Sequence, residues 1–374
     1  MRNITLGIIG GGQLGMLLIQ KALEFPVKVN LYDPNPDCSA AHFCTEFFEG
    51  SFDDADKLYA FGQKCDVIIY ELEKVDVETL LKLQAEGVRV VSKPETLEWI
   101  QDKGVQNQKL KESGLPIPEF EVYEADKVAN YNGPFPVVQK WLKDGYDGQG
   151  VNICSAKEDL QAVDCVLEEM VDIEKELSVI IARDEQGNVV SYDPVEMVFD
   201  PKANLVDYLI APARIEPSLN AEAIRICEQA AKDFDFVGVY AFELFLTKDG
   251  RLLVNEISPR VHNSGHQTVS ANKTSQYEQQ VRIALELPLG STEQISNCVL
   301  LNLLGAEGSS GETEYDGLKE AYEIPSVNYI FYGKTSSKPY RKMGHAIILE
   351  DDIQKAIAKV DLIKKTLTIK GNEN

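Results

Sequence analysis

The stretch FELFLTKDGRLLVNEISPRVHNSGH, residues 242–266, predicts a β-hairpin that runs into a polar loop. Apolar residues alternate on both sides of residues 248–250 (KDG), which are typical of a tight turn between two strands. Hairpin strands run antiparallel a few ångströms apart, so Glu243 and Glu256 are expected to lie side by side. Because adjacent carboxylates repel each other, they form either a solvated surface pair or a site for Mg²⁺, which prefers carboxylate and phosphate oxygens.

The loop behind Glu256 favours the metal site. It concentrates polar side chains, and loops at strand ends are where binding and catalytic residues are usually found. Pro259 and Gly265 restrict its course. The polar residues of the loop are Arg260, His262, Asn263, Ser264 and His266.

Size, charge and cysteine usage narrow the class of protein. A chain of 374 residues is too long for one compact core, so two or three domains are expected. Its 37 basic and 60 acidic residues give a net charge of −23, which argues against nucleic acid or an anionic membrane as a main partner. The seven cysteines form no C-x-x-C pair, which indicates buried thiols in a reducing cytoplasm. No signal peptide and no membrane-spanning stretch are recognised.

The N-terminal segment predicts a parallel α/β domain of roughly one hundred residues. A buried strand at 4–9 leads through GGGQLG (10–15) into a helix that begins near Met16, and a second strand at 27–31 is followed by Asp33. This pattern matches the dinucleotide fingerprint and makes an NAD-dependent oxidoreductase the main alternative. The same glycines would let the backbone approach any phosphate at a helix N-terminus. Further strands are expected at 67–70 and 88–91.

A glycine-rich loop in the middle of the chain predicts a lid over phosphates. The loop DGYDGQG (144–150) lies between a strand at 134–140, which ends in Lys140, and a returning strand at 151–153. Its backbone amides could wrap the terminal phosphates of a nucleotide. A plain glycine-rich connection is the alternative, but Tyr146 and Asp147 at the tip are unusual choices for a simple turn.

The remaining segments give weaker signals. A strand at 165–167 followed by an irregular segment could offer backbone groups to a purine, with Glu176 near a ribose. Four cations within residues 334–342 are either a solvated basic loop or an anion-binding patch. Helices are expected at 95–113, 218–234 and 267–289, and strands at 299–303 and 329–332.

Several motifs taken together resemble the ATP-grasp enzymes, and more narrowly the 5-(carboxyamino)imidazole ribonucleotide synthetases of purine synthesis. The resemblance covers nearly the whole chain. The Tyr-Asp-Gly and His-Asn-Ser-Gly-His runs are specific in combination, whereas the first glycine loop alone is not. The motifs are GGGQLG (10–15), ELE (71–73), GYDGQG (145–150), NEISPRVHNSGH (255–266) and RKMGH (341–345).

The resemblance implies an architecture and an activity. It implies an N-terminal α/β domain (1–98), an ATP-grasp domain of two α+β lobes (99–292, lid lobe about 115–170) and a small C-terminal domain (293–374). The implied reaction is the ATP- and bicarbonate-dependent carboxylation of the amine of 5-aminoimidazole ribonucleotide through carboxyphosphate. The implied assembly is a homodimer in the cytoplasm.

The resemblance also implies which residues bind ATP and its metal. Glu243 and Glu256 would carry Mg²⁺, with Mn²⁺ as an alternative. The ATP contacts would come from two lysines, from the lid glycines and from the segment that holds adenine and ribose. These residues are Lys103, Lys140, Gly145, Gly148, Gln149, Glu168, Glu169, Val171, Glu176 and Asn255.

Two further sets would contact the reactants. Bicarbonate and the reacting amine would be surrounded by Tyr146, Asp147, Arg260, His262 and Asn263. The ribonucleotide would be held by Lys334 and Arg341 with Glu73 opposite. The full set for the ribonucleotide is Gly12, Gln13, Leu14, Glu73, Lys334, Arg341 and Lys342.

The chain departs from the family pattern in three places, and three other functions remain as alternatives. Asp144 stands where a second glycine is common, Met197-Val198-Phe199 stands where many relatives have Asn-x-His, and Glu169-Met170 stands where a glycine often appears. The alternatives are a formate-dependent ribonucleotide transformylase, the NAD-dependent oxidoreductase and a non-catalytic nucleotide-binding protein.

Overall fold

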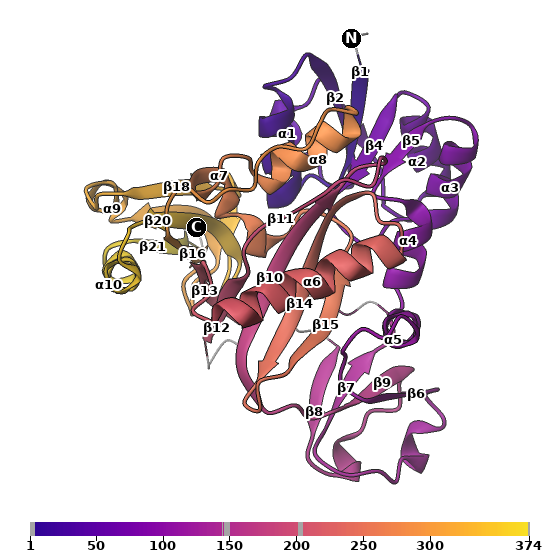
Figure 1. The fold of residues 1–374 in the computed structure, drawn as a ribbon. Helices are drawn as coiled ribbons and strands as arrows, with labels where there is room; N and C mark the ends of the chain where they lie inside the picture. The colour runs from indigo at the N-terminus through magenta and orange to yellow at the C-terminus, as the bar shows by residue number, and fades with distance from the viewer. Residues whose placement is uncertain (1–3, 144, 146–149, 201–204, 373–374) are drawn as a thin grey trace.

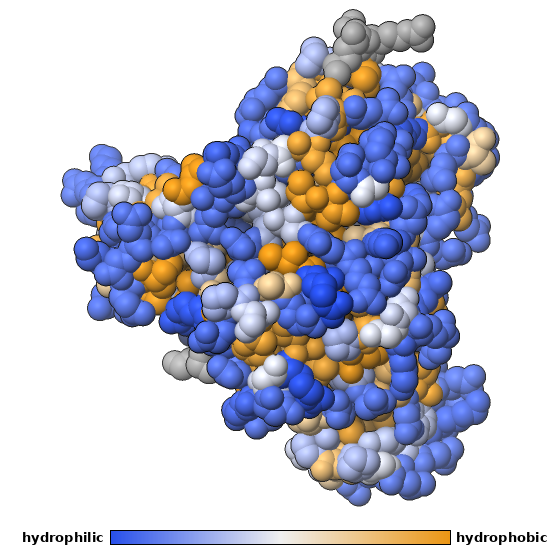
Figure 2. All heavy atoms as spheres, viewed as in Figure 1, coloured by the Kyte–Doolittle hydropathy of each residue, from blue (hydrophilic) through white to orange (hydrophobic). Residues whose placement is uncertain are grey.

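The structure is a computed structural model that describes residues 4–143, 145, 150–200 and 205–372. Figure 1 shows three regions around a long curved sheet: the indigo and purple N-terminal region, a small magenta sheet at the bottom, and the orange-to-yellow C-terminal region at the left. On the face shown in Figure 2, hydrophilic residues cover most of the surface and apolar residues form small separate patches. Across the described residues, no helix has the length and apolar character needed to cross a membrane.

The N-terminal region is a five-stranded parallel sheet in the order β3-β2-β1-β4-β5. Four of its strands are short apolar runs and were predicted from the sequence. The edge strand β3 was missed because its sequence, EFFE, is acidic at both ends and at most half-buried. The elements are β1 (Ile4–Ile9), α1 (Gln13–Ala22), β2 (Val27–Asp33), β3 (Glu46–Glu49), α2 (Ala55–Gly62), β4 (Val67–Tyr70), α3 (Val77–Ala85), β5 (Arg89–Val91) and α4 (Pro94–Ile100).

The glycine turn after β1 is tighter than the sequence predicted. Helix α1 begins at Gln13 rather than near Met16, with Gly12 as its N-cap. Gly10 has a φ of +96°, and a Cβ on Gly15 would lie 2.1 Å from the Gly10 carbonyl oxygen. The helix therefore packs directly on the turn, which only glycine permits at these two positions.

The lid region is a four-stranded antiparallel sheet in the order β6-β9-β7-β8. One of its faces covers a small core of its own that includes Val137, Cys154, Cys165 and Leu167. The other face turns toward the rest of the molecule. The strands are β6 (Phe120–Tyr123), β7 (Val137–Trp141), β8 (Val151–Cys154) and β9 (Cys165–Glu169).

The largest sheet has nine strands in the order β15-β14-β10-β12-β13-β16-β20-β18, with β11 paired to β10. It runs without interruption across the expected boundary between residues 292 and 293. Helix α6 crosses one face of β10 and β14 (Figure 1) and buries residues such as Leu177, Phe242 and Val254. The opposite face is covered near Ala182 and Val239 by the core that includes α8.

The elements of this sheet and of the C-terminal region have the following bounds. A separate three-stranded sheet, β19-β17-β21, flanks the C-terminal helix. The strands are β10 (Ile173–Arg183), β11 (Val189–Ser191), β12 (Val195–Asp200), β13 (Leu205–Ala211), β14 (Gly238–Thr247), β15 (Leu252–Ser258), β16 (Cys298–Leu304), β17 (Gly311–Asp316), β18 (Val327–Phe331), β19 (Ser336–Ser337), β20 (Lys342–Leu349) and β21 (Thr368–Asn372). The helices are α5 (Lys103–Glu112), α6 (Pro217–Asp233), α7 (Thr268–Ala271), α8 (Gln276–Ala284), α9 (Leu318–Tyr322) and α10 (Ile353–Thr366).

Two predicted helices are wrong in extent, whereas the helix predicted at 218–234 is confirmed as α6. The segment 95–113 is two helices, because Asp102 accepts hydrogen bonds from the amides of Gly104 and Val105 and so begins α5 anew. The segment 267–289 contains only the short helices α7 and α8. In both segments a new N-cap residue begins a second helix, so the single helix predicted from the apolar pattern is divided.

Arg89 on β5 joins the N-terminal region to the C-terminal end of α8. Its guanidinium donates to the carbonyl oxygens of Ala284 (2.7 Å) and Ile283 (2.9 Å) and to Glu185 (2.8 Å). We expect Arg89→Ala to lower the free energy of unfolding by about 2–4 kcal/mol, because it leaves helix-terminal carbonyls and a carboxylate without their charged donor. Urea denaturation measures this change.

The matched control is Arg225→Ala on the exposed face of α6, where Arg225 pairs with Glu222. Exposed ion pairs contribute little, so this variant should leave the denaturation midpoint nearly unchanged. Equal midpoints for the two variants would contradict a role of Arg89 as the link between the two regions.

Candidate active site

The two acids of the hairpin lie opposite each other on one face of the nine-stranded sheet. Glu243 on β14 pairs directly with Glu256 on β15, and directly paired residues project from the same face. Their side chains are 23% and 36% exposed, so both reach solvent rather than the core. The predicted pairing of these two acids in space is confirmed.

A β-bulge brings Asn255 onto the same face as the acids. The register shifts directly after Glu243, which makes Asn255 the extra residue of the bulge. In a regular strand the side chains of Asn255 and Glu256 would point to opposite faces. Here Val254 and Ile257 both enter the core beneath α6, whereas Asn255 Nδ2 lies 3.5 Å from Glu243 Oε2.

Two lysines from other elements reach these three side chains. Lys103, the first residue of α5, places its Nζ 2.5 Å from Glu256 Oε2. Lys140 on the lid strand β7 donates to Asn255 Oδ1 at 2.7 Å and also pairs with Glu168 at 2.7 Å. Acids from the hairpin and cations from two other elements therefore converge on one point.

The two paired acids differ in their affinity for a proton. The Lys103 ammonium holds the pKa of Glu256 well below its usual range, so this carboxylate is ionised. Burial, together with the charge of Glu256, raises the pKa of Glu243. Burial also raises the pKa of Glu176, on the neighbouring strand β10, to about 7. The cluster therefore carries more carboxylates than its lysines neutralise.

The donor set of this cluster fits a hard divalent cation. Two carboxylates and an amide oxygen are the ligand types that Mg²⁺ and Mn²⁺ prefer, and Mg²⁺ commonly binds through one or two carboxylates plus substrate phosphates. Within the described residues, no group of three or more His, Cys, Asp or Glu side chains could hold a metal ion. Glu243 and Glu256 supply two such carboxylates on one face of the sheet.

The loop from His262 to His266 lies beside the acids. The backbone amide of Ser264 donates to His262 Nδ1 at 3.3 Å, and its hydroxyl lies 2.8 Å from the same atom. The neutral His262 ring therefore carries its proton on Nε2, which lies 3.8 Å from Glu243 Oε1. Asn263 Oδ1 is held by His266 Nε2 at 3.0 Å.

Arg260 at the end of the hairpin forms an ion pair with Glu73, from the loop after β4. The distance from Nη2 to Glu73 Oε1 is 2.8 Å, and the Arg260 side chain is only 14% exposed. Burial opposes the charge on Arg260, yet the Glu73 carboxylate raises its pKa above the ordinary value. Sequence analysis did not predict this ion pair, and its assignment of Glu73 opposite Lys334 and Arg341 across the ribonucleotide stays a prediction.

The first glycine loop is closed by the chain's own carboxylates. Asp33 accepts a hydrogen bond from the Gly11 amide at 2.7 Å, and Glu71 accepts one from the Gly12 amide at 3.0 Å. In a dinucleotide-binding domain these amides face the pyrophosphate and the acid faces a ribose. Their internal pairing is a physical reason against the oxidoreductase alternative.

The N-terminal and C-terminal regions meet at Gln13 and Lys334. Lys334 Nζ lies 3.3 Å from Gln13 Oε1 and donates to the Lys342 carbonyl at 2.6 Å. Arg341 instead donates to the carbonyl and hydroxyl of Ser336 at 2.6 and 2.8 Å. Leu14 is 5% exposed and therefore buried. At the N-terminus of the helix, Gly12 and Gln13 reach the surface. The interpretation of this segment as a basic loop is partly wrong, because strand β20 begins at Lys342.

The three residues expected near adenine lie in different surroundings. Glu168 is buried, and its carboxylate pairs with Lys140 and accepts a hydrogen bond from Asn107 at 2.9 Å. Glu169 is exposed and accepts from the Glu119 amide. Val171 is 8% exposed. A direct contact of the Glu168 side chain with adenine would require an exchange of these partners.

Sequence analysis missed an apolar surface on the lid. Val151 and Ile153 on β8 are 45% and 57% exposed. They pair with Lys140 and Val138 and share their face, and Lys140 from this face reaches Asn255 on the hairpin. The signal in the sequence was that apolar residues occupy both faces of this strand, Val151 and Ile153 on one and Cys154 on the other, whereas a strand with only one covered face needs them on one face alone. This surface suits the flat apolar face of a purine.

The tip of the lid loop lies outside the described residues. Asp144, Tyr146, Asp147, Gly148 and Gln149 all belong to that gap. Gly150, which follows it, has a φ of +79°, and a Cβ there would come 3.1 Å from the Trp141 ring. A glycine is therefore required where the loop returns to β8.

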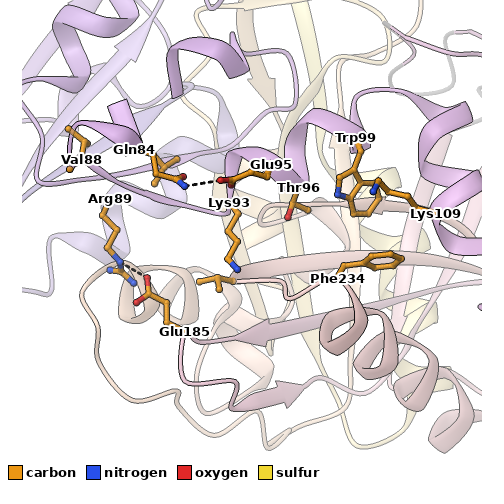
Figure 3. Close-up of a pocket in the computed structure, with 13 residues that line it drawn as sticks. Gln84, Val88, Arg89, Lys93, Glu95, Thr96, Trp99, Lys109, Glu185 and Phe234 are labelled. Atoms are coloured by element: carbon orange, nitrogen blue, oxygen red, sulfur yellow. Dashed lines mark hydrogen bonds and ion pairs between the residues drawn. The ribbon is translucent and has the colours of Figure 1, made fainter. Parts of the chain in front are cut away.

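A cavity of about 670 Å³ lies elsewhere, between α3, α4 and the segment around Phe234. Figure 3 shows Arg89 directed at Glu185, and Gln84 at Glu95, across this cavity. Lys93 is likewise paired, with Asp235. Because these polar groups are already satisfied by the chain itself, the cavity is a groove between two regions and not the candidate site.

Comparisons with known proteins identify the domains of the chain. Residues 3–101 match the ribonucleotide synthetase preATP-grasp domain, residues 108–277 the ATP-grasp domain, and residues 298–359 the phosphoribosylaminoimidazole carboxylase C-terminal domain. The crystal structure of N5-carboxyaminoimidazole ribonucleotide synthetase from Thermotoga maritima is 41% identical, covers 99% of this chain and 100% of that chain, and has a TM-score of 0.91. This chain belongs to the N5-carboxyaminoimidazole ribonucleotide synthetase family. The predicted ATP-grasp fold, with its N-terminal parallel α/β domain and its C-terminal domain, is confirmed.

Other members of the family resemble the chain over nearly its whole length. The N5-carboxyaminoimidazole ribonucleotide synthase of Synechococcus elongatus is 36% identical and covers 91% of this chain and 88% of its own. The Aspergillus clavatus synthase, in complex with ADP and 5-aminoimidazole ribonucleotide, is 26% identical, covers 96% of this chain and 99% of its own, and has a TM-score of 0.85. The chain spans 64% of the length of a longer plant relative named phosphoribosylaminoimidazole carboxylase.

The raised pKa of Glu176 predicts a pH-dependent stability. Below the pKa of the unfolded chain the acid is protonated in both states. As the pH rises toward 7 the unfolded chain releases this proton before the folded chain does, so stability falls. Relative to Glu176→Gln, the unmodified chain should lose about 2 kcal/mol between about pH 5 and about pH 8, after a discount for partial exposure.

Urea denaturation across this pH range measures the difference. Glu158→Gln, which changes an exposed acid, is the control and should keep the pH profile of the unmodified chain. Parallel profiles for the unmodified chain and Glu176→Gln would show that burial does not disfavour the charge on Glu176.

Proposed function

We propose that this chain uses ATP and bicarbonate to carboxylate the amine of 5-aminoimidazole ribonucleotide, with release of ADP and phosphate. The observation that carries the proposal is the convergence of Lys103 and Lys140 on the Glu243–Asn255–Glu256 cluster. This is the charge distribution that a metal-bound triphosphate requires, in a chain of the N5-carboxyaminoimidazole ribonucleotide synthetase family. We include in the proposal the three domains 1–98, 99–292 and 293–374 and a homodimer.

ATP lies between the lid and the hairpin in this proposal. The purine packs against the apolar lid face of Val151 and Ile153, the backbone of residues 169–171 contacts its edge, and Glu176 contacts the ribose. Lys103 and Lys140 exchange their present carboxylate partners for phosphate oxygens. When bound at Glu243 and Glu256, Mg²⁺ would neutralise charge on the transferred phosphoryl group.

The reaction has two steps whose atoms balance. A bicarbonate oxygen attacks the γ-phosphorus, the bond to the β-phosphate oxygen breaks, and carboxyphosphate and ADP result. The substrate amine then forms a bond to the carboxyl carbon, either directly or after release of CO₂, and phosphate and one proton leave. Phosphoryl transfer of this kind depends on positioning and on charge stabilisation more than on covalent participation by the protein.

The residues around the hairpin end are assigned to the reactants. The planar guanidinium of Arg260 suits bidentate binding of bicarbonate. Its positive charge would then be shared between bicarbonate and Glu73. His262 presents an Nε2 proton toward the acids and acts as a hydrogen-bond donor. We also assign Tyr146 and Asp147, which lie outside the described residues, to the reactants: Asp147 accepts the amine proton, and water must be excluded from carboxyphosphate.

The ribonucleotide is assigned to the junction of the first and last regions. Gly12 and Gln13 lie at the N-terminus of α1, and Lys334 reaches Gln13 from the far end of the chain. Lys342 and Arg341 add positive charge at the same end, which suits the phosphate of a ribonucleotide.

The proposal is tested by ADP release. With ATP, Mg²⁺ and bicarbonate present, adding 5-aminoimidazole ribonucleotide should increase ADP formation, and carboxylated product should appear in equal amount. Replacement of bicarbonate by formate should abolish product. Product with formate would identify a transformylase, and nucleotide binding without turnover would identify a non-catalytic binding protein; either result overturns the proposal.

The metal assignment is tested by binding rather than by turnover. Mn²⁺ bound in the presence of ADP can be measured by electron paramagnetic resonance. Glu256→Gln and Glu243→Gln should each weaken this binding at least about tenfold, because each removes a charged ligand. Glu158→Gln, on the exposed surface, should leave it unchanged. Unaltered Mn²⁺ affinity in both ligand variants would remove the hairpin acids from the metal site.

A further inference from the structure

A cluster of two histidines and two tyrosines is buried behind the loop 262–266. The rings of His266 and His345 stack with centroids 4.4 Å apart and planes 6° from parallel. Tyr277 on α8 and Tyr332, just after β18, flank them, and each of the four residues is at most 1% exposed. The cluster thus joins the hairpin loop to the C-terminal part of the sheet.

The hydrogen bonds of His266 fix the position of its proton. Its Nε2 lies 3.0 Å from Asn263 Oδ1, and a carboxamide oxygen can only accept. Nε2 therefore carries the hydrogen, and Nδ1 accepts from the hydroxyl of Tyr277, with which it is hydrogen-bonded. Both nitrogens of this buried ring are satisfied in one tautomer.

The second histidine holds the first in place. The Tyr332 hydroxyl lies 2.8 Å from His345 Nδ1 and 3.4 Å from His266 Nε2, so it bridges the two stacked rings. Burial lowers the pKa of His345 to about 3 and lowers that of His266 as well. Stacking against His345 prevents rotation of the His266 ring. Because both rings are neutral, His266 also carries no charge that would attract another partner.

The consequence falls on Asn263, which sits beside His262 and is half-buried. Its carboxamide oxygen is taken by His266. Its Nδ2 group donates to none of the residues that the structure describes. Asn263 therefore presents an N–H donor, and not an oxygen acceptor, on the side of the loop away from the ring cluster.

We propose that His266 is a positioning residue that holds the Asn263 carboxamide with its N–H group directed to the reacting anion, and that Tyr277, His345 and Tyr332 fix His266 for this purpose. The proposal rests on the proposed function, in which Asn263 lies beside bicarbonate. A free carboxamide can flip its oxygen and nitrogen; an oxygen turned to bicarbonate would repel it, whereas an N–H donor stabilises the charge that develops on it. Hydrogen-bond partners that orient metal ligands change affinity or activity by about 10- to 100-fold, and we expect an effect of that order here.

Substitutions that remove single hydrogen bonds test the role of His266. His266→Leu removes the donor to Asn263, and Tyr277→Phe removes the hydroxyl that fixes the His266 tautomer. Each should lower kcat by about tenfold or more while the KM for ATP stays unchanged. His266→Gln keeps an N–H group near the Nε2 position and should recover most of kcat.

Tyr192→Phe is the matched control for lost burial and lost hydrogen bonding. Tyr192 is 2% exposed, and its hydroxyl donates to the Thr274 carbonyl at 2.8 Å, outside the ring cluster. This variant should lower the melting temperature about as much as Tyr277→Phe yet keep the kcat of the unmodified protein. Equal kcat in Tyr192→Phe, Tyr277→Phe and His266→Leu would overturn the proposal, as would failure of His266→Gln to recover activity beyond His266→Leu.

A spectroscopic measurement makes the test independent of turnover. In the full-length protein labelled with ¹⁵N-histidine, His266 should show a protonated Nε2 and an unprotonated Nδ1 at neutral pH. Asn263→Ala should shift the Nε2 resonance. An Nδ1–H tautomer or an imidazolium would refute the proposed orientation even if the ADP assay succeeds. If the ADP assay fails, the proposed function falls, and the resonances still decide whether His266 holds Asn263.

Discussion

Two like-charged carboxylates held on adjacent strands are the constraint on which this structure depends. Glu243 and Glu256 cannot move apart, because they are paired in a sheet whose other face is buried under α6. Their repulsion is relieved by Lys103, which arrives from a separate helix, and by the proton that the raised pKa of Glu243 retains. The carboxylates therefore favour binding of a divalent cation. The lysines of the neighbouring elements favour binding of the phosphates that accompany it.

The parts of the fold that depend on local pattern were predictable. Alternating apolar residues predicted β14 and β15, and the glycines at 10–15 predicted the turn into α1. The bulge at Asn255 was not predicted, although two consecutive polar residues between Val254 and Ile257 were its trace in the sequence. A periodic pattern fixes which residues face the core, but a single extra residue reverses the faces beyond it. The break before α5 was likewise visible only as an N-cap residue inside an otherwise helical stretch.

The contacts between distant segments were not predictable in detail. Gln13 and Lys334 are 321 positions apart, and nothing local to either residue indicates that they meet. The ion pair between Glu73 and Arg260 was not predicted for the same reason, because nothing local to either residue indicates that they meet. Motif recognition grouped these residues, whereas the pairing among them follows from how the three regions pack. The ring cluster behind Asn263 was invisible because its histidines belong to two motifs that looked independent.

The nine-stranded sheet sets a fixed length between the two ends of the proposed substrate site. Ladder hydrogen bonds join β13 to β16 in the pairs Tyr208–Leu301 through Ala211–Cys298, so the hairpin half and the C-terminal half form a single rigid plate. Sliding one half past the other would break every bond of that ladder at once. The paired strands therefore keep a constant distance between the part of the sheet proposed to bind the terminal phosphate of the nucleotide and the part nearest the cations of the C-terminal region. A longer or shorter acceptor molecule would therefore be accommodated by the segments that carry Lys334 and Arg341, which lie outside the strands of this sheet, and not by a shift between β13 and β16.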